Sequence, residues 1–184
     1  IDPVLLFSTF YGGQLRDEAK SVGLDAQGNL NVGGLATSQD FPVTPGVVQG
    51  KVNGSGNDIF LVKLNATGTA VLYSTLIGGN GEESDASIVV HPGGEVTVGG
   101  TTTSANFPPT GNAYQNSPRG GTDGFALKLN ATGTALLNST RIGGKGTDSV
   151  HGAGIDANGS AYVTGETDSS DFPVTVDTFR TERL

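Results

Sequence analysis

The sequence predicts an all-β fold built from repeated four-stranded antiparallel units. Three observations lead to this prediction: the composition, an internal repeat, and tight-turn sequences between short apolar runs. Glycine accounts for 30 of the 184 residues, and 35% of the residues are hydrophobic. This composition is too glycine-rich for a helical bundle. The short runs of Val, Thr, Ile and Leu favour strands joined by tight turns.

The repeat is visible in motifs that recur at spacings of 66 and 65 residues. The phrase KLNATGTA occurs twice, at Lys63–Ala70 and at Lys128–Ala135. Two further motifs occur three times each. The first occurs as FSTFYGG (Phe7–Gly13), YSTLIGG (Tyr73–Gly79) and NSTRIGG (Asn138–Gly144). The second occurs as DFPVT (Asp40–Thr44), NFPPT (Asn106–Thr110) and DFPVT (Asp171–Thr175). Catalytic sites are rarely duplicated inside one domain, whereas a unit that stacks on its own copies must be repeated.

One repeat contains four expected strands. They are AKSVGLD (Ala19–Asp25) with Val22 and Leu24 pointing inward, LNVGGLAT (Leu30–Thr37), DIFLVKLN (Asp58–Asn65) with Phe60, Val62 and Leu64 on one face, and AVLYSTLI (Ala70–Ile77). The duplicated phrase contains NATGT, in which Asn65 suits a turn and Gly68 can adopt positive φ. We therefore expect this phrase to close a hairpin between the third and fourth strands.

Four antiparallel strands per period are the unit of a β-propeller blade. At about 65 residues, the period is longer than the usual 40 to 50 residues of well-known blades. The excess lies in the connection between the second and third strands, residues 38–57. There we expect Phe41 to pack against the blade and Pro42 to stiffen the loop.

The register predicts an incomplete ring of under three blades over residues 1–184. Residues 1–10, with a strand at Leu5–Phe10, would be the last strand of a preceding blade. Residues 19–77 and 84–142 would form blades, and residues 150–184 a partial blade. Propellers have about four to eight blades, so strand edges would stay unpaired at both ends.

Two explanations for this register are open. The chain is a segment of a longer propeller, or copies complete one another by strand donation into a ring or a filament. In the second case the assembly strand would contain Val4, Leu5, Leu6 and Phe7.

The combined motifs resemble a known family. Four motifs follow one another in each repeat: ST-x-x-GG-x-G-x-D, V/I-D-x-x-GN/GS-x-Y-V-x-G, S-x-DFP-x-T and D-x-F-x-x-KLN-x-TG. This pattern is similar to the bacterial SBBP-type β-propeller repeat of secreted and surface proteins. Small departures are Asn31 at the position of Tyr162, and His91 at the position of Asp25 and Asp156. The resemblance implies a propeller fold and an extracellular or cell-surface location. It implies no reaction.

The charge and the composition of the chain limit the classes of partner that we expect. The net charge is −8 and the pI is about 4.5, which disfavours nucleic acid and anionic membranes. The sequence has no apolar run near 18 residues, so we expect no membrane insertion. Cysteine is absent, which removes disulfides and thiolate metal sites.

Three acids recur at equivalent positions beyond each Gly-Gly pair: Asp17, Glu83 and Asp148. They are weak candidates for a ring that holds a divalent cation such as calcium, or a cationic ligand, at the channel mouth. The alternative is that each acid accepts hydrogen bonds from its own loop. No calcium-loop motif is present. Apart from this possible cation, we expect no cofactor.

We expect no catalytic residues. The two histidines, His91 and His151, are not equivalent in the repeat, and His91 occupies an expected solvated turn. The leading hypothesis is a non-enzymatic extracellular scaffold for contact with other surface proteins or for self-assembly. A lectin-like propeller that binds carbohydrate is the alternative. A hydrolase or lyase with a site at the channel mouth is a third class, for which only His151 with Asp148 offers a hint.

Overall fold

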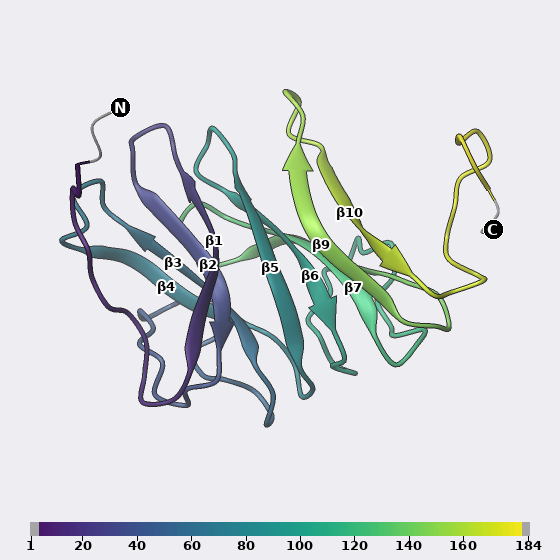
Figure 1. The fold of residues 1–184 in the computed structure, drawn as a ribbon, viewed down its shortest axis with the longest axis horizontal. Helices are drawn as coiled ribbons and strands as arrows, with labels where there is room; N and C mark the ends of the chain where they lie inside the picture. The colour runs from purple at the N-terminus through teal and green to yellow at the C-terminus, as the bar shows by residue number, and fades with distance from the viewer. Residues whose placement is uncertain (1–3, 182–184) are drawn as a thin grey trace.

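The computed structural model describes residues 4–181 and places three antiparallel sheets side by side (Figure 1). Its strands are β1 (Asp17–Leu24), β2 (Leu30–Ala36), β3 (Asp58–Leu64), β4 (Val71–Ile77), β5 (Glu83–Val90), β6 (Val96–Thr102), β7 (Asp123–Leu129), β8 (Leu136–Ile142), β9 (Asp148–Ile155) and β10 (Ala161–Thr167). Within the described range, no helix is long and apolar enough to cross a membrane.

Spatial order follows chain order in each sheet. The first two sheets run β1-β2-β3-β4 and β5-β6-β7-β8, and the third contains β9 and β10. The three sheets form no closed ring over residues 4–181. These features confirm the predicted fold class, an all-β chain of four-stranded propeller blades in an incomplete ring. The third sheet begins at Asp148, two residues before the expected partial blade 150–184, and the rest of it lies inside that range. Residues 182–184 lie outside the described residues.

The duplicated phrase forms the expected hairpin turn. Gly68 has a φ of 69°, a left-handed conformation that favours glycine, and its amide donates to the Asn65 carbonyl at 2.9 Å. The Asn65 side chain accepts a further hydrogen bond from the Thr69 amide at 2.8 Å. Asn130 and Gly133 repeat this geometry in the second blade, where the φ of Gly133 is 74°. The turn is therefore duplicated because the blade is.

The long connection after the second strand covers the edge of the fourth. In the first blade the Thr44 amide donates to the Ser74 carbonyl, and the Leu76 amide donates to the Gln49 carbonyl, each at 3.0 Å. The second blade repeats both bonds with residues 110, 139, 141 and 115. An uncovered outer strand would offer unpaired backbone groups for aggregation. The additional residues of the 65-residue period thus protect the outer edge of each blade.

Aromatic pairs anchor each connection to its blade. Phe41 stacks on Phe60 with ring centroids 4.9 Å apart, and Phe107 meets Phe125 at 4.5 Å. All four side chains are buried. Phe41 therefore packs against its blade, as the sequence predicts.

The blades stack through their first strands. The Ile88 side chain of β5 is 7% exposed and lies against Gly33 of the first blade, where a side chain would collide with it. Its counterpart in β1, Val22, is 63% exposed, and so is Leu24 on the same face. The prediction that these two side chains point inward was wrong. No blade lies before β1 in the described chain to cover them.

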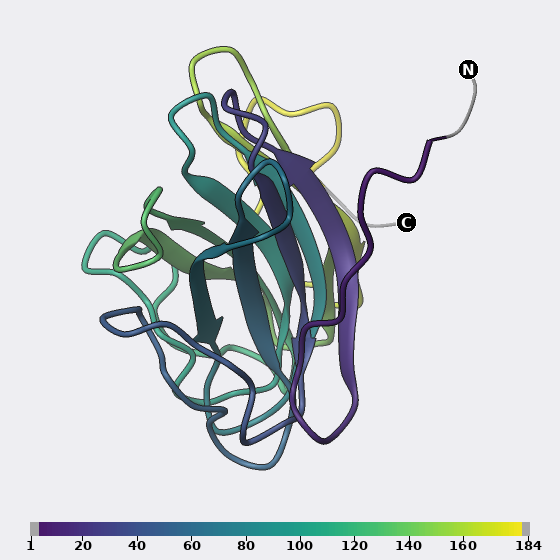
Figure 2. The same cartoon turned by 90° about the vertical axis from the view of Figure 1, so that its left-hand side faces the viewer.

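The segment before β1 forms no strand. Residues 4–16 have no ladder partner, so the expected strand at Leu5–Phe10 is absent; residues 1–3 lie outside the described range. Such a strand would need a third-strand neighbour from a preceding blade, which the described residues do not provide. The segment nevertheless lies at the outer side of the first sheet (Figures 1 and 2), with the ring of Phe7 over Gly68. Tyr73 lies over Gly133 in the same way.

Candidate functional site: the acidic loops before the first strands

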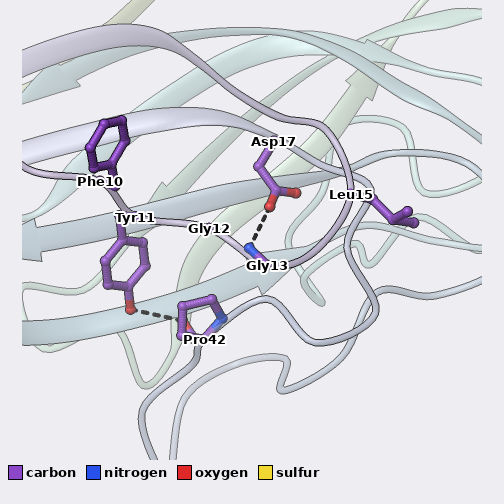
Figure 3. Close-up of a pocket in the computed structure, with 7 residues that line it drawn as sticks. All are labelled: Phe10, Tyr11, Gly12, Gly13, Leu15, Asp17 and Pro42. Carbon is purple, nitrogen blue, oxygen red and sulfur yellow. Dashed lines mark hydrogen bonds between the residues drawn. The ribbon is translucent and has the colours of Figure 1, made fainter.

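Each first strand begins with one of the three recurring acids. In the first blade, the Asp17 carboxylate accepts hydrogen bonds from the Gly13 amide at 2.7 Å, the Ser38 hydroxyl at 2.7 Å and the Thr37 amide at 3.0 Å. Figure 3 shows the bond from Gly13, which turns the carboxylate back onto its own loop.

The second blade repeats this arrangement with Glu83, whose side chain is fully buried. Its carboxylate accepts from the Gly79 amide at 3.1 Å and from the hydroxyls of Thr102 and Ser104, both at 2.6 Å.

In the third blade, Asp148 accepts from the Gly144 amide at 2.8 Å, from the Ser169 hydroxyl at 2.7 Å and from the Thr167 hydroxyl. All three acids therefore bind the loop of their own blade and the end of its second strand.

The polar residues of the S-x-D/N-F-P motif complete the same network. In the first blade, the Ser38 hydroxyl accepts from the Leu15 amide at 2.9 Å, and the Asp40 side chain accepts from the Gln14 amide at 3.0 Å. The later blades repeat both bonds, at Ser104, Asn106, Ser169 and Asp171. We call the acid, this serine and this Asp or Asn the loop latch of each blade.

The loop latch occupies the lone pairs of its acid. Burial opposes ionisation of Asp17, but hydrogen bonds from Gly13, Ser38 and Thr37 together lower the pKa of Asp17 below its usual value. A carboxylate that already accepts several hydrogen bonds has few free oxygen positions for a cation. Within residues 4–181, no group of three or more His, Cys, Asp or Glu side chains could hold a metal ion. The geometry favours the structural alternative for Asp17, Glu83 and Asp148, and the calcium hypothesis stays a prediction.

A buried carboxyl pair lies at the junction of the first two blades, and sequence reasoning missed it. Asp58 and Glu83 are both fully buried, and one oxygen of each adjoins Gly78. Asp58 Oδ2 accepts from the Asn53 amide at 2.8 Å, whereas Oδ1 has no hydrogen-bonding partner. Burial raises the pKa of Asp58 to about 7, with the Asn53 hydrogen bond opposing and the Glu83 carboxylate adding to the rise.

The second junction repeats the carboxyl pair with a cation beside it. Asp123 and Asp148 adjoin Gly143, and Arg141 Nη1 lies 3.8 Å from Asp123 Oδ2. Burial raises the pKa of Asp123, while its hydrogen bond from Arg119 and the charge of Arg141 oppose the rise.

In the first blade, an apolar leucine, Leu76, takes the place of Arg141. The sequence carried a signal for these pairs, since Asp58 and Asp123 begin the repeated D-x-F motif. The partner of each aspartate lies in the next blade and becomes visible only in three dimensions.

The histidines do not form the constellation that the enzyme hypothesis requires. His91 is 4% exposed, and its Nε2 lies 2.7 Å from the Thr97 hydroxyl, so the expectation of a solvated turn was wrong. His151 lies 3.5 Å from Asp85 and 3.6 Å from Glu166. Asp148 accepts hydrogen bonds from Gly144, Thr167 and Ser169 of its own repeat, so the structure does not pair it with His151.

A cavity of about 350 Å³ adjoins the first loop latch (Figure 3). Its lining includes Phe10, Tyr11, Asp17 and Pro42. The Tyr11 hydroxyl donates to the Pro42 carbonyl at 2.8 Å, and Asp17 faces Gly13, so both polar groups bind the protein itself. Phe10 is fully exposed, whereas its counterpart in the next repeat, Leu76, is fully buried. The cavity is therefore an uncovered part of a blade junction.

Comparison with protein-family models gives one match. Residues 137–173 match the SBBP beta-propeller repeat. This stretch runs from β8 through the third loop latch and both strands of the last sheet to the Asp-Phe-Pro motif. It therefore contains every member of that latch. No curated protein matches the chain.

Proposed function

Because residues 137–173 carry a beta-propeller repeat, we propose that the protein is a non-enzymatic scaffold that makes protein contacts through uncovered blade faces. Its partners would be copies of itself or other surface proteins, in an extracellular or cell-surface setting. The resemblance of the motifs to repeats of secreted and surface proteins supports that setting.

One observation carries this proposal. Ile88 of β5 is 7% exposed because the first blade covers it, whereas its counterpart Val22 in β1 is 63% exposed. Leu24, two residues along the same face, is exposed to the same degree. Neighbouring large apolar side chains on an uncovered sheet face favour an interaction site. The internal junction shows the kind of surface that such a face accepts, which is another blade.

The recurring polar groups support the non-enzymatic part of the proposal. Asp17, Glu83 and Asp148 serve as acceptors for their own loops, and each repeats with the blade. A catalytic site generally needs groups that break such symmetry and converge on a reacting atom.

Thiol labelling tests the proposed face, because the chain has no cysteine of its own. Val22→Cys places a single thiol on the face, and Leu72→Cys, at a side chain 50% exposed on β4, is the matched control. If the face makes protein contacts, labelling at position 22 slows as protein concentration rises, while labelling at position 72 does not. Equal, concentration-independent rates up to millimolar protein would contradict contacts between copies through this face.

A further inference from the structure

The first strands of the three sheets, β1, β5 and β9, lie next to one another (Figure 1). Serine hydroxyls join them. The Ile88 amide of β5 donates to the Ser21 hydroxyl of β1 at 3.2 Å. The Ala153 amide of β9 donates to the Ser87 hydroxyl of β5 at 3.1 Å. The middle strand β5 therefore has a neighbouring sheet on each side within the described chain, and both walls of a site along it come from the chain itself.

A cavity of about 230 Å³ opens along β5, and its lining comes from the three first strands alone. The lining residues are Lys20 and Ser21 of β1, Asp85, Ala86 and Ser87 of β5, and His151 of β9. The Nδ1 atom of His151 lies 3.5 Å from Oδ2 of Asp85. None of Lys20, Asp85 and His151 belongs to a loop latch or to a buried carboxyl pair, so the structural roles described above do not account for them.

The chemistry of this cavity does not follow the repeat. Lys20, Ala86 and His151 occupy equivalent positions, at the bulge that interrupts each first strand. Asp85 occupies a position where the other two first strands have an apolar residue. An amine, a carboxylate and an imidazole thus meet at one place, whereas the loop latches recur in every blade. Polar groups that converge on a cavity and break the repeat favour a binding site.

Asp85 adopts a strained backbone conformation that places its carboxylate in this cavity. Its φ is 57°, and no other non-glycine residue between positions 4 and 181 has a positive φ. Val150, the equivalent of Asp85 in β9, is buried against the neighbouring blade. In β5 the buried residue is Ala86, and the Asp85 side chain is instead 39% exposed and lies beside His151. Left-handed conformations of non-glycine residues are unfavourable and cluster at functional sites.

The hydrogen-bonding groups left free in the cavity match the hydroxyl groups of a ligand. The Ser21 and Ser87 hydroxyls each accept from an amide, and each keeps its own proton for a further partner. Lys20 uses one of its three donors on Glu18, at 2.8 Å. Asp85 accepts a hydrogen bond through Oδ2, and none of the described residues donates to its Oδ1. A ligand that supplies both donors and acceptors therefore fits this set.

The lining disfavours other classes of ligand. It contains no aromatic side chain and no aliphatic one larger than alanine, so it offers an apolar ligand little contact. The carboxylates of Glu18, Asp85 and Glu166 outnumber the ammonium of Lys20, which disfavours an anion. His151 turns opposite ring nitrogens towards Asp85 and Glu166, so these three side chains do not converge on one metal ion.

We propose that Lys20, Asp85 and His151, with the two serines, form a binding site for a sugar residue between the first strands of the three sheets. Adjacent sugar hydroxyls donate to Asp85 and accept from Lys20 and the serine hydroxyls, because each hydroxyl both donates and accepts. Drug-sized ligands occupy pockets of roughly 300–1,000 Å³, so this cavity suits a smaller ligand of the size of one sugar ring. The site goes beyond the proposed scaffold function, which concerns the face of Val22 and Leu24.

Saturation-transfer NMR tests the site, with magnetisation passed from the 184-residue protein to glucose, galactose, mannose or N-acetylglucosamine. We expect saturable binding of at least one of these sugars with a Kd of roughly 1–10 mM, as suits a ligand of this size. Lys20→Ala should weaken the binding at least about tenfold. The matched control is Lys51→Ala, at an exposed lysine of the first connection, and it should leave the binding unchanged.

Asp85→Gly separates binding from stability. Glycine adopts a φ of 57° without strain, so we expect this variant to keep a melting temperature close to that of the wild type and to lose the sugar signal. Asp85→Asn keeps the shape of the side chain and a residue that tolerates the left-handed conformation, and it should also weaken binding because an NH₂ group replaces one acceptor oxygen. If Asp85→Gly fails to fold, Asp85→Asn and Lys20→Ala decide.

Three results would overturn the inference. The first is no saturable binding of any of the four sugars up to about 100 mM. The second is binding that Lys20→Ala and both Asp85 variants leave unchanged. The third is a melting temperature of Asp85→Asn well below that of the wild type together with unchanged sugar binding, which would make the carboxylate structural. Thiol labelling at position 22 tests the scaffold separately, so the failure of either proposal is distinguishable from the failure of the other.

Discussion

The buried Asp58–Glu83 pair makes a specific prediction about pH. Burial raises the pKa of Asp58 to about 7 from an ordinary value of 3.8, so the folded state holds a proton that the unfolded state has released between these two pH values. Stability from this group is therefore fully present below pH 3.8 and falls as the pH rises towards 7. The free energy of unfolding can fall by at most about 1.4 kcal/mol per pH unit, and by at most roughly 4 kcal/mol over the whole range.

The substitution Asp58→Asn isolates this contribution. An asparagine can keep the hydrogen bond from the Asn53 amide while its NH₂ group faces Glu83, which imitates the protonated acid. At pH 8 we expect the variant to be more stable than the wild type by about 1 to 4 kcal/mol. This difference should become smaller as the pH falls and should vanish only near pH 3.8, where the wild-type carboxyl is protonated in both the folded and the unfolded state.

The assay is urea unfolding at several pH values between 5 and 8. At each pH, the free energy of unfolding of the wild type is subtracted from that of the variant. The difference is needed because burial lowers the pKa of His91. That shift adds stability above pH 6.5 that is lost as the pH falls, which opposes the slope from Asp58 in the wild type. A stability difference that does not change with pH, or a variant less stable than the wild type at pH 8, would contradict a raised pKa of Asp58 in the folded state.

Three further predictions concern the blades and their loop latches. Phe60→Ala and Phe125→Ala should each lower the free energy of unfolding by about 3–5 kcal/mol in urea titrations. Losses near zero would contradict the packing of these two rings in the blade cores. Ser104→Ala should cost about 1–3 kcal/mol, because it leaves the Gly81 amide without its acceptor and removes one of the hydrogen bonds to the Glu83 carboxylate. Ser117→Ala, at an exposed loop position, should change the free energy of unfolding by no more than about 0.5 kcal/mol, and equal effects of the two substitutions would contradict the structural role of the loop latch. Removing calcium with a chelator should leave the melting temperature unchanged, since the loop-latch acids already accept several hydrogen bonds; a clear fall would establish a calcium site.

The features that could be predicted from the sequence depend on contacts within one hairpin or one blade. The turn at Asn65 and Gly68 depends on residues within one hairpin, and the packing of Phe41 on Phe60 depends on contacts within one blade. Both predictions were correct. The repeat supplied the rest of the fold class, because four strands per period admit few other architectures.

Contacts between blades were not predictable in the same way. Whether Val22 is covered depends on a neighbouring blade, and the alternation of apolar residues in β1 gives no information about that neighbour. His91 was assigned to solvent from its turn position, although packing beside Thr97 buries it. The Asp58–Glu83 pair joins residues from different repeats, so a motif read within one repeat does not contain it.

The mass of the chain in solution, measured by light scattering over a range of concentrations with negative-stain imaging of the same sample, tests the scaffold proposal most directly. We expect a mass that rises with concentration towards defined rings or filaments. We expect a lower mass for Val22→Asp, which places a charge on the uncovered face of β1. A constant monomer mass for both proteins at all concentrations would contradict the claim that this face makes contacts between copies.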